Sequence, residues 1–423
     1  MEHVPQELVD KFIDELKDNN QSLRACSLVS RYWVSRSRRH LFQRIVFPTA
    51  DRLAKYCDMF PTNHIVHSYV RGLAIIQWNR DPWIGRRALR CGLEHLQNFR
   101  ALESLILAGI TNGSARGFDA IEALADGLRV AAPSIKTLKL VHWKVSSTTL
   151  IEFICRFPSL DTLVVEDMDY LVGLPGWKRP SKFPPFAGHF EFSNSNGHGS
   201  AGKFLRHLSR LPLGFREISI DAGGAVDPVV AILEKCSPVL ARASLYYVYP
   251  RGMVLVFLFR TVEKSVEPLT EFLGVPIREI KASFPELREL TLKPGLQYAG
   301  IIDGFALKLL SVISSPHLFR VTLDHSAPYS FGLADTNKWR EADRTMFELT
   351  QRIGRRVSFN WYFAYAAEDV ERTIRSLLER INSLGALRIL EGGKALDMVT
   401  AIGDRWSGIV PEEVDWTNIP FGV

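Results

Sequence analysis

Apolar residues near the amino end of the chain recur at helical spacing. Pro5 suits the first turn of a helix, and the run Asp18, Asn19 and Asn20 favours turns and caps. Between them the apolar residues repeat every three or four positions, which places them on one helix face: Leu8, Val9, Phe12, Ile13 and Leu16. We therefore expect a helix that ends near Lys17.

Two further short helices are expected after this one. Ser22 is a candidate cap for a helix that carries Leu23, Cys26 and Val29. Ser30 is a candidate cap for a third, with Trp33, Val34, Ser37 and Leu41 on one side. Because a unit of about forty residues rarely buries enough apolar surface alone, its remaining apolar face needs a cover.

A second pattern recurs through the rest of the chain and has the form Pro-x-L-x-x-L-x-L. Alternating apolar residues of this kind predict a strand with its leucines on one side. Clear copies begin at Pro133, Pro158, Pro285 and Pro316. Looser copies begin at Val70, Leu102, Phe215 and Leu240.

Helical stretches precede most copies of this strand pattern. They cover residues 87–98, 118–131, 148–157, 228–236 and 304–314. No single unit could bury its leucines, so stacked units must share one core. We expect an α/β fold, an irregular solenoid over residues 46–423 with parallel strands inside and helices outside.

Other stretches predict further elements or breaks. We expect a strand at residues 45–47, a helix at 51–60, a buried strand at 253–259 and a loop excursion at about 172–203, which is rich in Gly, Pro, Ser and Asn. A second break at 329–339 precedes a strand at 361–365, a helix at 368–382 and a strand at 387–390. The tail beyond residue 392 is expected to cap the array.

Composition favours a folded protein of the cytoplasm or nucleus. The chain is 46% apolar, and 52 Lys and Arg against 46 Asp and Glu give a net charge of only +6, which does not demand nucleic acid. Its five cysteines form no C-x-x-C pair, which suits a reducing compartment. The amino end shows no secretory pattern, and no apolar run approaches the roughly 20 residues that span a bilayer, so we expect no membrane insertion.

Four patterns resemble catalytic or metal-binding motifs, but each lacks a residue that its chemistry requires. Gly197 to Lys203 matches part of a phosphate-binding loop, but Phe204 replaces the Mg²⁺-binding hydroxyl. His198 replaces the first glycine of a nucleophile elbow at residues 198–202. Cys57, His64 and His67 lack a fourth metal ligand, and Asp167 and Asp169 lack a partner base. We expect no catalytic residue, metal or cofactor.

The amino-terminal residues resemble a known docking module, the F-box. The resemblance lies in the order Val4-Pro5-x-Glu7-Leu8, Phe12-Ile13, Leu16, Ser22-Leu23, Cys26, Val29 and Trp33, with residues 37–42 similar to fungal F-box proteins. It covers residues 1–45 of 423. Val4 stands where the family usually has Leu, and Ser30 where it often has Cys.

The F-box resemblance implies that the chain binds the Skp adaptor, and through it the cullin, of a ubiquitin ligase. The adaptor-binding residues would be Val4, Pro5, Leu8, Phe12, Ile13, Leu16, Leu23, Cys26, Val29 and Trp33. The strand pattern resembles leucine-rich repeats, although the asparagine that often follows the strand is absent. Two alternatives are a repeat scaffold without a ligase, and a nucleic-acid binder that uses the basic third helix, whose Trp33 and Leu41 argue against that use.

Residues between the inward leucines are expected on the concave face of the solenoid. Their mixed polar chemistry suits recognition of a target protein better than catalysis. The candidate target-binding residues are Lys139, Glu166, Ser219, Asp221, Tyr246, Thr291, Lys293, Thr322 and Asp324.

Overall fold

The described part of the chain forms two compact units. The computed structural model describes residues 4–62, 64–76, 95–109, 121–122, 124–170, 186–193, 198–221, 226–247, 280, 284–294, 304–325, 336–363 and 368–391. Among the described residues, unit 1 holds those up to Val145 and Thr149–Leu160, and unit 2 holds Ser146–Thr148 and those from Asp161 to Glu391. The predicted boundary at residue 45 falls inside the first strand of unit 1.

Unit 1 begins with three helices, α1 (Gln6–Glu15), α2 (Asn20–Val29) and α3 (Arg31–Leu41). The Ser30 side chain caps α3 by accepting a hydrogen bond from the Tyr32 amide, as expected. The predicted cap of α2 was wrong: Asn19 caps that helix and accepts from the Ser22 amide. Val9, Ile13 and Leu23 form a small core with Leu16, Trp33 and Leu41 packed against it.

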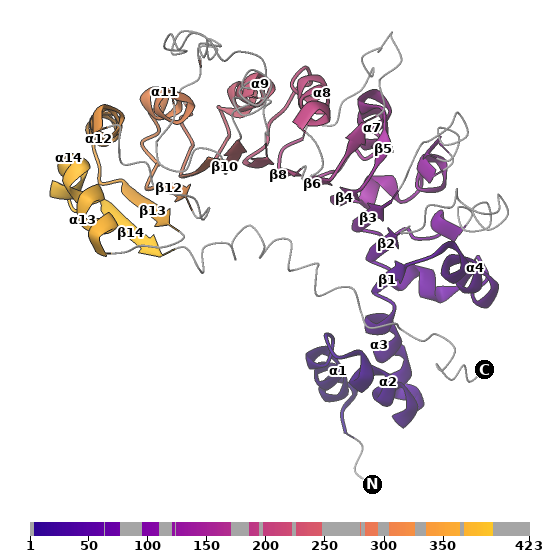
Figure 1. Ribbon diagram of the computed structural model, residues 1–423. Coiled ribbons are helices and arrows are strands. Elements are labelled where there is room, and N and C mark those ends of the chain that lie inside the picture. Colours follow the sequence, from indigo (N-terminus) through magenta and orange to yellow (C-terminus); the bar gives the residue numbers. More distant parts are fainter. Residues whose placement is uncertain are drawn as a thin grey trace, which may run out of the picture. The chain divides into compact units, whose positions relative to one another are not determined.

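Four parallel strands follow in unit 1: β1 (Arg44–Phe47), β2 (Gly72–Ile76), β3 (Ser104–Ala108) and β4 (Thr137–Val141) (Figure 1). Ile45, Leu73, Leu105 and Leu138 are in register and buried, as the x-L-x-L alternation predicts. Connecting elements are α4 (Ala50–Met59), the 3-10 turns η1 (Ile65–Tyr69) and η2 (Ala132–Ser134), and β5 (Lys144–Val145). Helix α7 (Ser147–Ile154) completes these elements.

An aromatic cluster fills the space between α4, η1 and the first strand. The Tyr56 ring contacts Phe47, Phe60, His67 and Phe99, with ring centroids 4.8 to 6.2 Å apart. Phe42, which follows α3, packs edge-on against Phe60 at 5.6 Å. The amino-terminal helices are thereby anchored to the strand region of unit 1.

Unit 2 repeats the strand-and-helix pattern. Its strands are β6 (Thr162–Glu166), β7 (Asp169–Tyr170), β8 (His189–Ser193), β9 (Glu217–Asp221), β10 (Arg242–Tyr247), β11 (Glu289–Pro294), β12 (Arg320–His325), β13 (Ser358–Phe363) and β14 (Leu387–Glu391). Its helices are α8 (His198–Leu208), α9 (Val226–Cys236), α11 (Gly304–Val312), α12 (Thr336–Ile353), α13 (Glu368–Leu377) and α14 (Glu379–Ser383).

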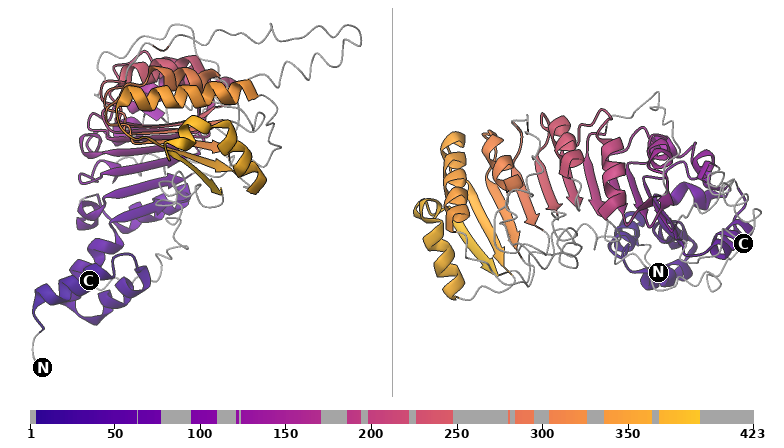
Figure 2. Two further views of the ribbon diagram at one scale, coloured as in Figure 1. Left: turned by 90° about the vertical axis from the view of Figure 1, so that its left-hand side faces the viewer. Right: turned by 45° about the horizontal axis from the view of Figure 1, so that its top comes forward.

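From β6 to β14, all strands of unit 2 except β7 pair in parallel and in chain order. Ile218, Ala243, Leu290, Val321 and Phe359 are in register and buried. Helices α8, α9, α11 and α12 lie along one face of this sheet (Figures 1 and 2). The solenoid-like α/β fold expected from the sequence is therefore present in unit 2.

The predicted loop at residues 172–203 was partly wrong. Residues 189–193 form β8, which pairs with β6 and β9, and α8 begins at His198. Phe190 and Phe192 supply the buried alternation of this strand, but flanking Gly, Ser and Asn residues obscure it in the sequence. The break predicted at 329–339 also overlaps α12, which begins at Thr336.

Several expectations lie outside the described residues. They include the strand at 253–259, the tail beyond residue 392 and most of the helix at 87–98. Among the helices that the structure describes, none has the length and apolar run that crossing a bilayer requires.

Candidate docking surface

Helices α1, α2 and α3 expose an unusual amount of apolar surface. Leu8 is 56% exposed and Phe12 is 53% exposed, although both lie on α1, whose Val9 and Ile13 belong to the small core. Val4, Leu28, Val29 and Tyr32 are between 62% and 77% exposed. We call Val4, Leu8, Phe12, Leu28 and Val29 the apolar patch. Exposed apolar side chains in this number on three short helices favour a surface that a partner covers.

The predicted adaptor-binding residues divide into two groups. Val4, Pro5, Leu8, Phe12 and Val29 are exposed and available to a partner. Ile13, Leu23 and Cys26 are buried inside the module, and Leu16 and Trp33 are half-buried against its core. Their role in this structure is to hold the three helices together.

Sequence reasoning missed the exposure of Leu28 and Tyr32. Leu28 precedes Val29, the last residue of α2. Tyr32 is the second residue of α3. A signal was available, because neither residue fits the core spacing of its helix: Leu23 and Cys26 face inward on α2, and Ser37 is fully buried on α3.

An ion-pair cluster joins α1 to α3. The Asp14 carboxylate accepts hydrogen bonds from Arg36 Nε at 2.6 Å and Nη2 at 2.5 Å, and it lies 2.7 Å from His40 Nε2. The Arg36 guanidinium is the largest cause of the lowered Asp14 pKa, which is about 2, with His40 adding to the effect. This bidentate arrangement ties α1, which carries Leu8 and Phe12, to α3.

The basic residues of α3 have structural roles that reduce the case for a nucleic-acid-binding helix. Arg36 is held by Asp14. Arg38, Arg39 and His40 occupy the last helical turn, where positive charge complements the negative end of the helix dipole.

The sheet of unit 2 presents polar residues on the face opposite its helices, which we call the open face. One row across it runs Thr162, His189, Glu217, Arg242, Glu289, Arg320 and Ser358. The next row runs Val164, Glu191, Ser219, Ser244, Thr291, Thr322 and Asn360. Because the pairing is in register, side chains of equal position lie side by side.

Charges in the first row of the open face alternate and pair with one another. Glu217 forms an ion pair with Arg242, and Arg320 Nη1 lies 3.4 Å from the Glu289 carboxylate. His189 lies between two carboxylates, with 3.6 Å from its Nε2 to Glu191 and from its Nδ1 to Glu217. The charged side chains are therefore held in fixed positions across several strands.

The structure brings most candidate target-binding residues onto this face. Asp221, Tyr246 and Lys293 are in register on adjacent strands, and Lys293 Nζ lies 3.4 Å from the Asp324 carboxylate. Ser219, Thr291 and Thr322 occupy the second row, and Glu166 pairs in register with Ser193. Lys139 lies on β4 of unit 1.

His189, Glu191 and Asn360 are open-face residues that sequence reasoning missed. His189 and Glu191 belong to β8, which had been predicted as loop, and Asn360 precedes the strand boundary expected at Trp361. The alternation His-Phe-Glu-Phe at residues 189–192 was the available signal.

The sequence patterns that could carry chemistry have ordinary structural settings. Gly202 and Lys203 lie inside α8, and within the described residues no group of His, Cys, Asp and Glu has the arrangement of a metal site. His67 is buried in the aromatic cluster, and this burial lowers its pKa to about 4, with the His95 and His64 charges adding to the effect. Burial raises the pKa of both Cys155 and Cys236 to about 12.

Comparison with known proteins gives no family assignment. No protein-family model matches the chain, and no curated protein matches it. Among solved structures, a crystal structure of a Bacteroides fragilis protein, a structural genomics target, matches with 12% sequence identity and a TM-score of 0.29. The match covers 53% of this chain and 74% of that protein.

Proposed function

We propose that this chain is the substrate-recognition subunit of a Skp–cullin–RING ubiquitin ligase. In this proposal α1–α3 act as an F-box that binds the Skp adaptor, and the strand-and-helix array is a degenerate leucine-rich-repeat solenoid that binds a target protein. The chain itself does no chemistry. It raises the local concentration of the target beside the enzyme that carries ubiquitin.

The observation that carries the proposal is the apolar patch. Leu8 and Phe12 are more than half exposed on a helix whose opposite side is packed. Removing such side chains from water is the main favourable term in protein association, and large apolar anchors near the centre of an interface dominate its energy. A partner with an apolar groove therefore fits α1–α3.

The open face of unit 2 supports the second half of the proposal. Most of its side chains are half-buried, and strand register and ion pairs hold them in rows. A broad, preorganised polar surface suits recognition of a protein, because little side-chain freedom is lost on binding.

Co-expression with the Skp adaptor tests the docking role. The double variant Leu8→Asp and Phe12→Asp should lower the amount of co-purified adaptor by at least about tenfold, since anchor residues of this kind each contribute more than about 1 kcal/mol. Val239→Asp is a matched control, because Val239 is 41% exposed but lies in unit 2. Equal recovery of adaptor with all three chains would refute the docking role.

A further inference from the structure

Unit 1 contains a pocket on the flank of α1 that faces away from Leu8 and Phe12. The pocket has a volume of about 470 Å³ and is lined by Gln6, Asp10, Tyr32, Ser35, Arg36, Arg39, Gln43, Ser68, Tyr69 and Arg71. Gln6 and Asp10 each lie two positions from Leu8, and two positions on a helix are about 200° apart. An adaptor that covers the apolar patch therefore leaves this pocket open.

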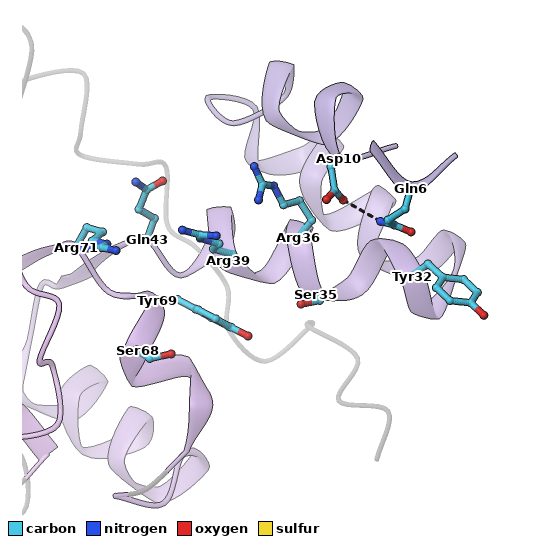
Figure 3. A pocket seen from close by; sticks show the side chains of 10 residues that line it. All are labelled: Gln6, Asp10, Tyr32, Ser35, Arg36, Arg39, Gln43, Ser68, Tyr69 and Arg71. Carbon is cyan, nitrogen blue, oxygen red and sulfur yellow. Dashed lines mark hydrogen bonds between the residues drawn. The ribbon is translucent and has the colours of Figure 1, made fainter. Parts of the chain in front are cut away.

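The walls of the pocket are fixed by the backbone. The Gln43 carbonyl at the end of α3 accepts hydrogen bonds from the amides of Arg71 at 2.8 Å and Gly72 at 2.9 Å. Figure 3 shows the side chains of Arg39, Gln43 and Tyr69 gathered between α3 and the η1 segment. This arrangement holds donors from two separate parts of the chain around one hollow.

The chemistry of the pocket favours a carboxylate-bearing ligand. Three guanidinium groups, from Arg36, Arg39 and Arg71, face one carboxylate, Asp10. Two of the three already hold carboxylates: Arg36 binds Asp14, and Arg71 Nη1 lies 2.8 Å from Glu103. Within the described residues no carboxylate pairs with Arg39. The Arg39 guanidinium is therefore the group that can bind a carboxylate of a ligand.

The chain itself supplies a segment of matching charge near its carboxyl end. Residues 406–423 contain Glu412, Glu413 and Asp415 and no Lys or Arg. Trp416 follows directly, and the aromatic side chains Tyr32 and Tyr69 are among those that line the pocket. The last described residue is Glu391. Residues 392–411, which connect it to the acidic segment, can extend to about 65 Å, so their length leaves that segment a wide reach.

We propose that the pocket binds the acidic segment at residues 412–415 of the same chain. One of its carboxylates pairs with Arg39, with Gln43 and Tyr69 as additional donors. The contact joins the carboxyl end of the chain to the amino-terminal helices and leaves the apolar patch uncovered. It is independent of adaptor binding, so either proposal can fail without the other.

Disulfide cross-linking in the full chain tests this proposal without any adaptor. With Ser35→Cys and Thr417→Cys introduced together, mild oxidation should give a 35–417 cross-link detected by mass spectrometry. The same experiment with Gln21→Cys in place of Ser35→Cys should give little product, since Gln21 is exposed on α2 and does not line the pocket. Equal yields for the two pairs would overturn the proposal.

Charge substitutions make the test specific to Arg39. Arg39→Glu should lower the yield of the 35–417 cross-link at least about fivefold, whereas Arg31→Glu, an exposed arginine of α3 outside the pocket, should not. Adding Glu412→Arg and Glu413→Arg to Arg39→Glu should restore the yield. An unchanged yield with Arg39→Glu would contradict the proposal. So would cross-links that form mainly between isotopically labelled and unlabelled copies.

Discussion

Asp14 connects α1 to α3 through Arg36 and His40, and its carboxylate is about a third exposed. Solvent screening reduces the value of such a pair, but the bidentate geometry raises it above that of an ordinary surface ion pair. We expect Asp14→Asn to lower the free energy of unfolding by about 1 kcal/mol. Chemical denaturation measures this, with Asp18→Asn, an exposed carboxylate in the following turn, as the control. Equal stabilities of the two variants would contradict the role of Asp14.

Asp14 also predicts a dependence of stability on pH. Its pKa is about 2 in the folded chain against an ordinary value of 3.8. The folded state therefore favours the charged form, so this stabilisation is complete above about pH 4 and is lost as the pH falls toward 2.

The buried His67 should cause a second loss of stability, which begins at a higher pH than the loss caused by protonation of Asp14. Its pKa falls from 6.5 to about 4 on folding because the ring is buried among Tyr56, Phe99 and His95. The folded state favours the neutral ring, so the stability of unit 1 is complete above pH 6.5 and declines as the pH falls toward 4. A shift of this size corresponds to about 3 kcal/mol.

Thermal melts at pH 7.5 and pH 5 test the role of His67. The melting temperature of the natural chain should fall between these pH values, and His67→Phe should make the fall smaller. His317→Phe, which changes an exposed histidine of unit 2, should leave the pH dependence as it is. A decline that is equally steep in all three chains would exclude His67 as its cause.

At the scale of single elements, Gly188 permits the start of β8 to approach β6. A Cβ atom at residue 188 would lie 1.9 Å from the Asp161 carbonyl oxygen, which accepts the His189 amide at 2.7 Å. The backbone itself would have to move, so Gly188→Ala should destabilise unit 2 by about 1–3 kcal/mol. Gly214→Ala is the matched control, because its Cβ would meet only the Phe186 carbonyl at 3.4 Å. Denaturant unfolding of the two variants should differ clearly, and equal stabilities would contradict this account of β8.

Elements with a strong apolar alternation were predictable from the sequence. The phrase beginning at Pro285 gave β11, whose Leu290 and Leu292 are buried, and the copy beginning at Pro316 gave β12. Two strong local signals, a Pro and a period of two, agree in these segments.

Elements whose local signals conflict were not predictable. Phe190 and Phe192 have strand spacing, but the surrounding Gly, Ser and Asn residues indicated a loop, and pairing with β6 and β9 decided the outcome. The capping residue of α2 was predicted wrongly for a similar reason. Asn19 and Ser22 are both good capping residues, and which of them caps the helix depends on where the helix begins. Helix spacing alone could not separate the exposed Val29 from the buried Cys26, because the difference depends on how α2 packs against α3.

For the molecule as a whole, the sequence predicted an α/β array after three helices, and the helices proved to expose the apolar side chains on which the docking proposal depends. Burial inside the module separates two roles that the sequence alone merged: Ile13, Leu23 and Cys26 stabilise the three helices, and Leu8 and Phe12 face outward. The identity of the protein that the open face would bind could not be predicted, because the side chains on this face are of mixed polarity and form no recognisable motif.

The most direct test of adaptor docking is backbone hydrogen exchange of the full chain with and without the purified Skp adaptor. The account predicts that added adaptor slows exchange in peptides from α1, α2 and α3, while peptides from the open-face strands β9 to β12 exchange at unchanged rates. Exchange that is unaltered throughout α1–α3, or protection confined to the open face, would contradict the account.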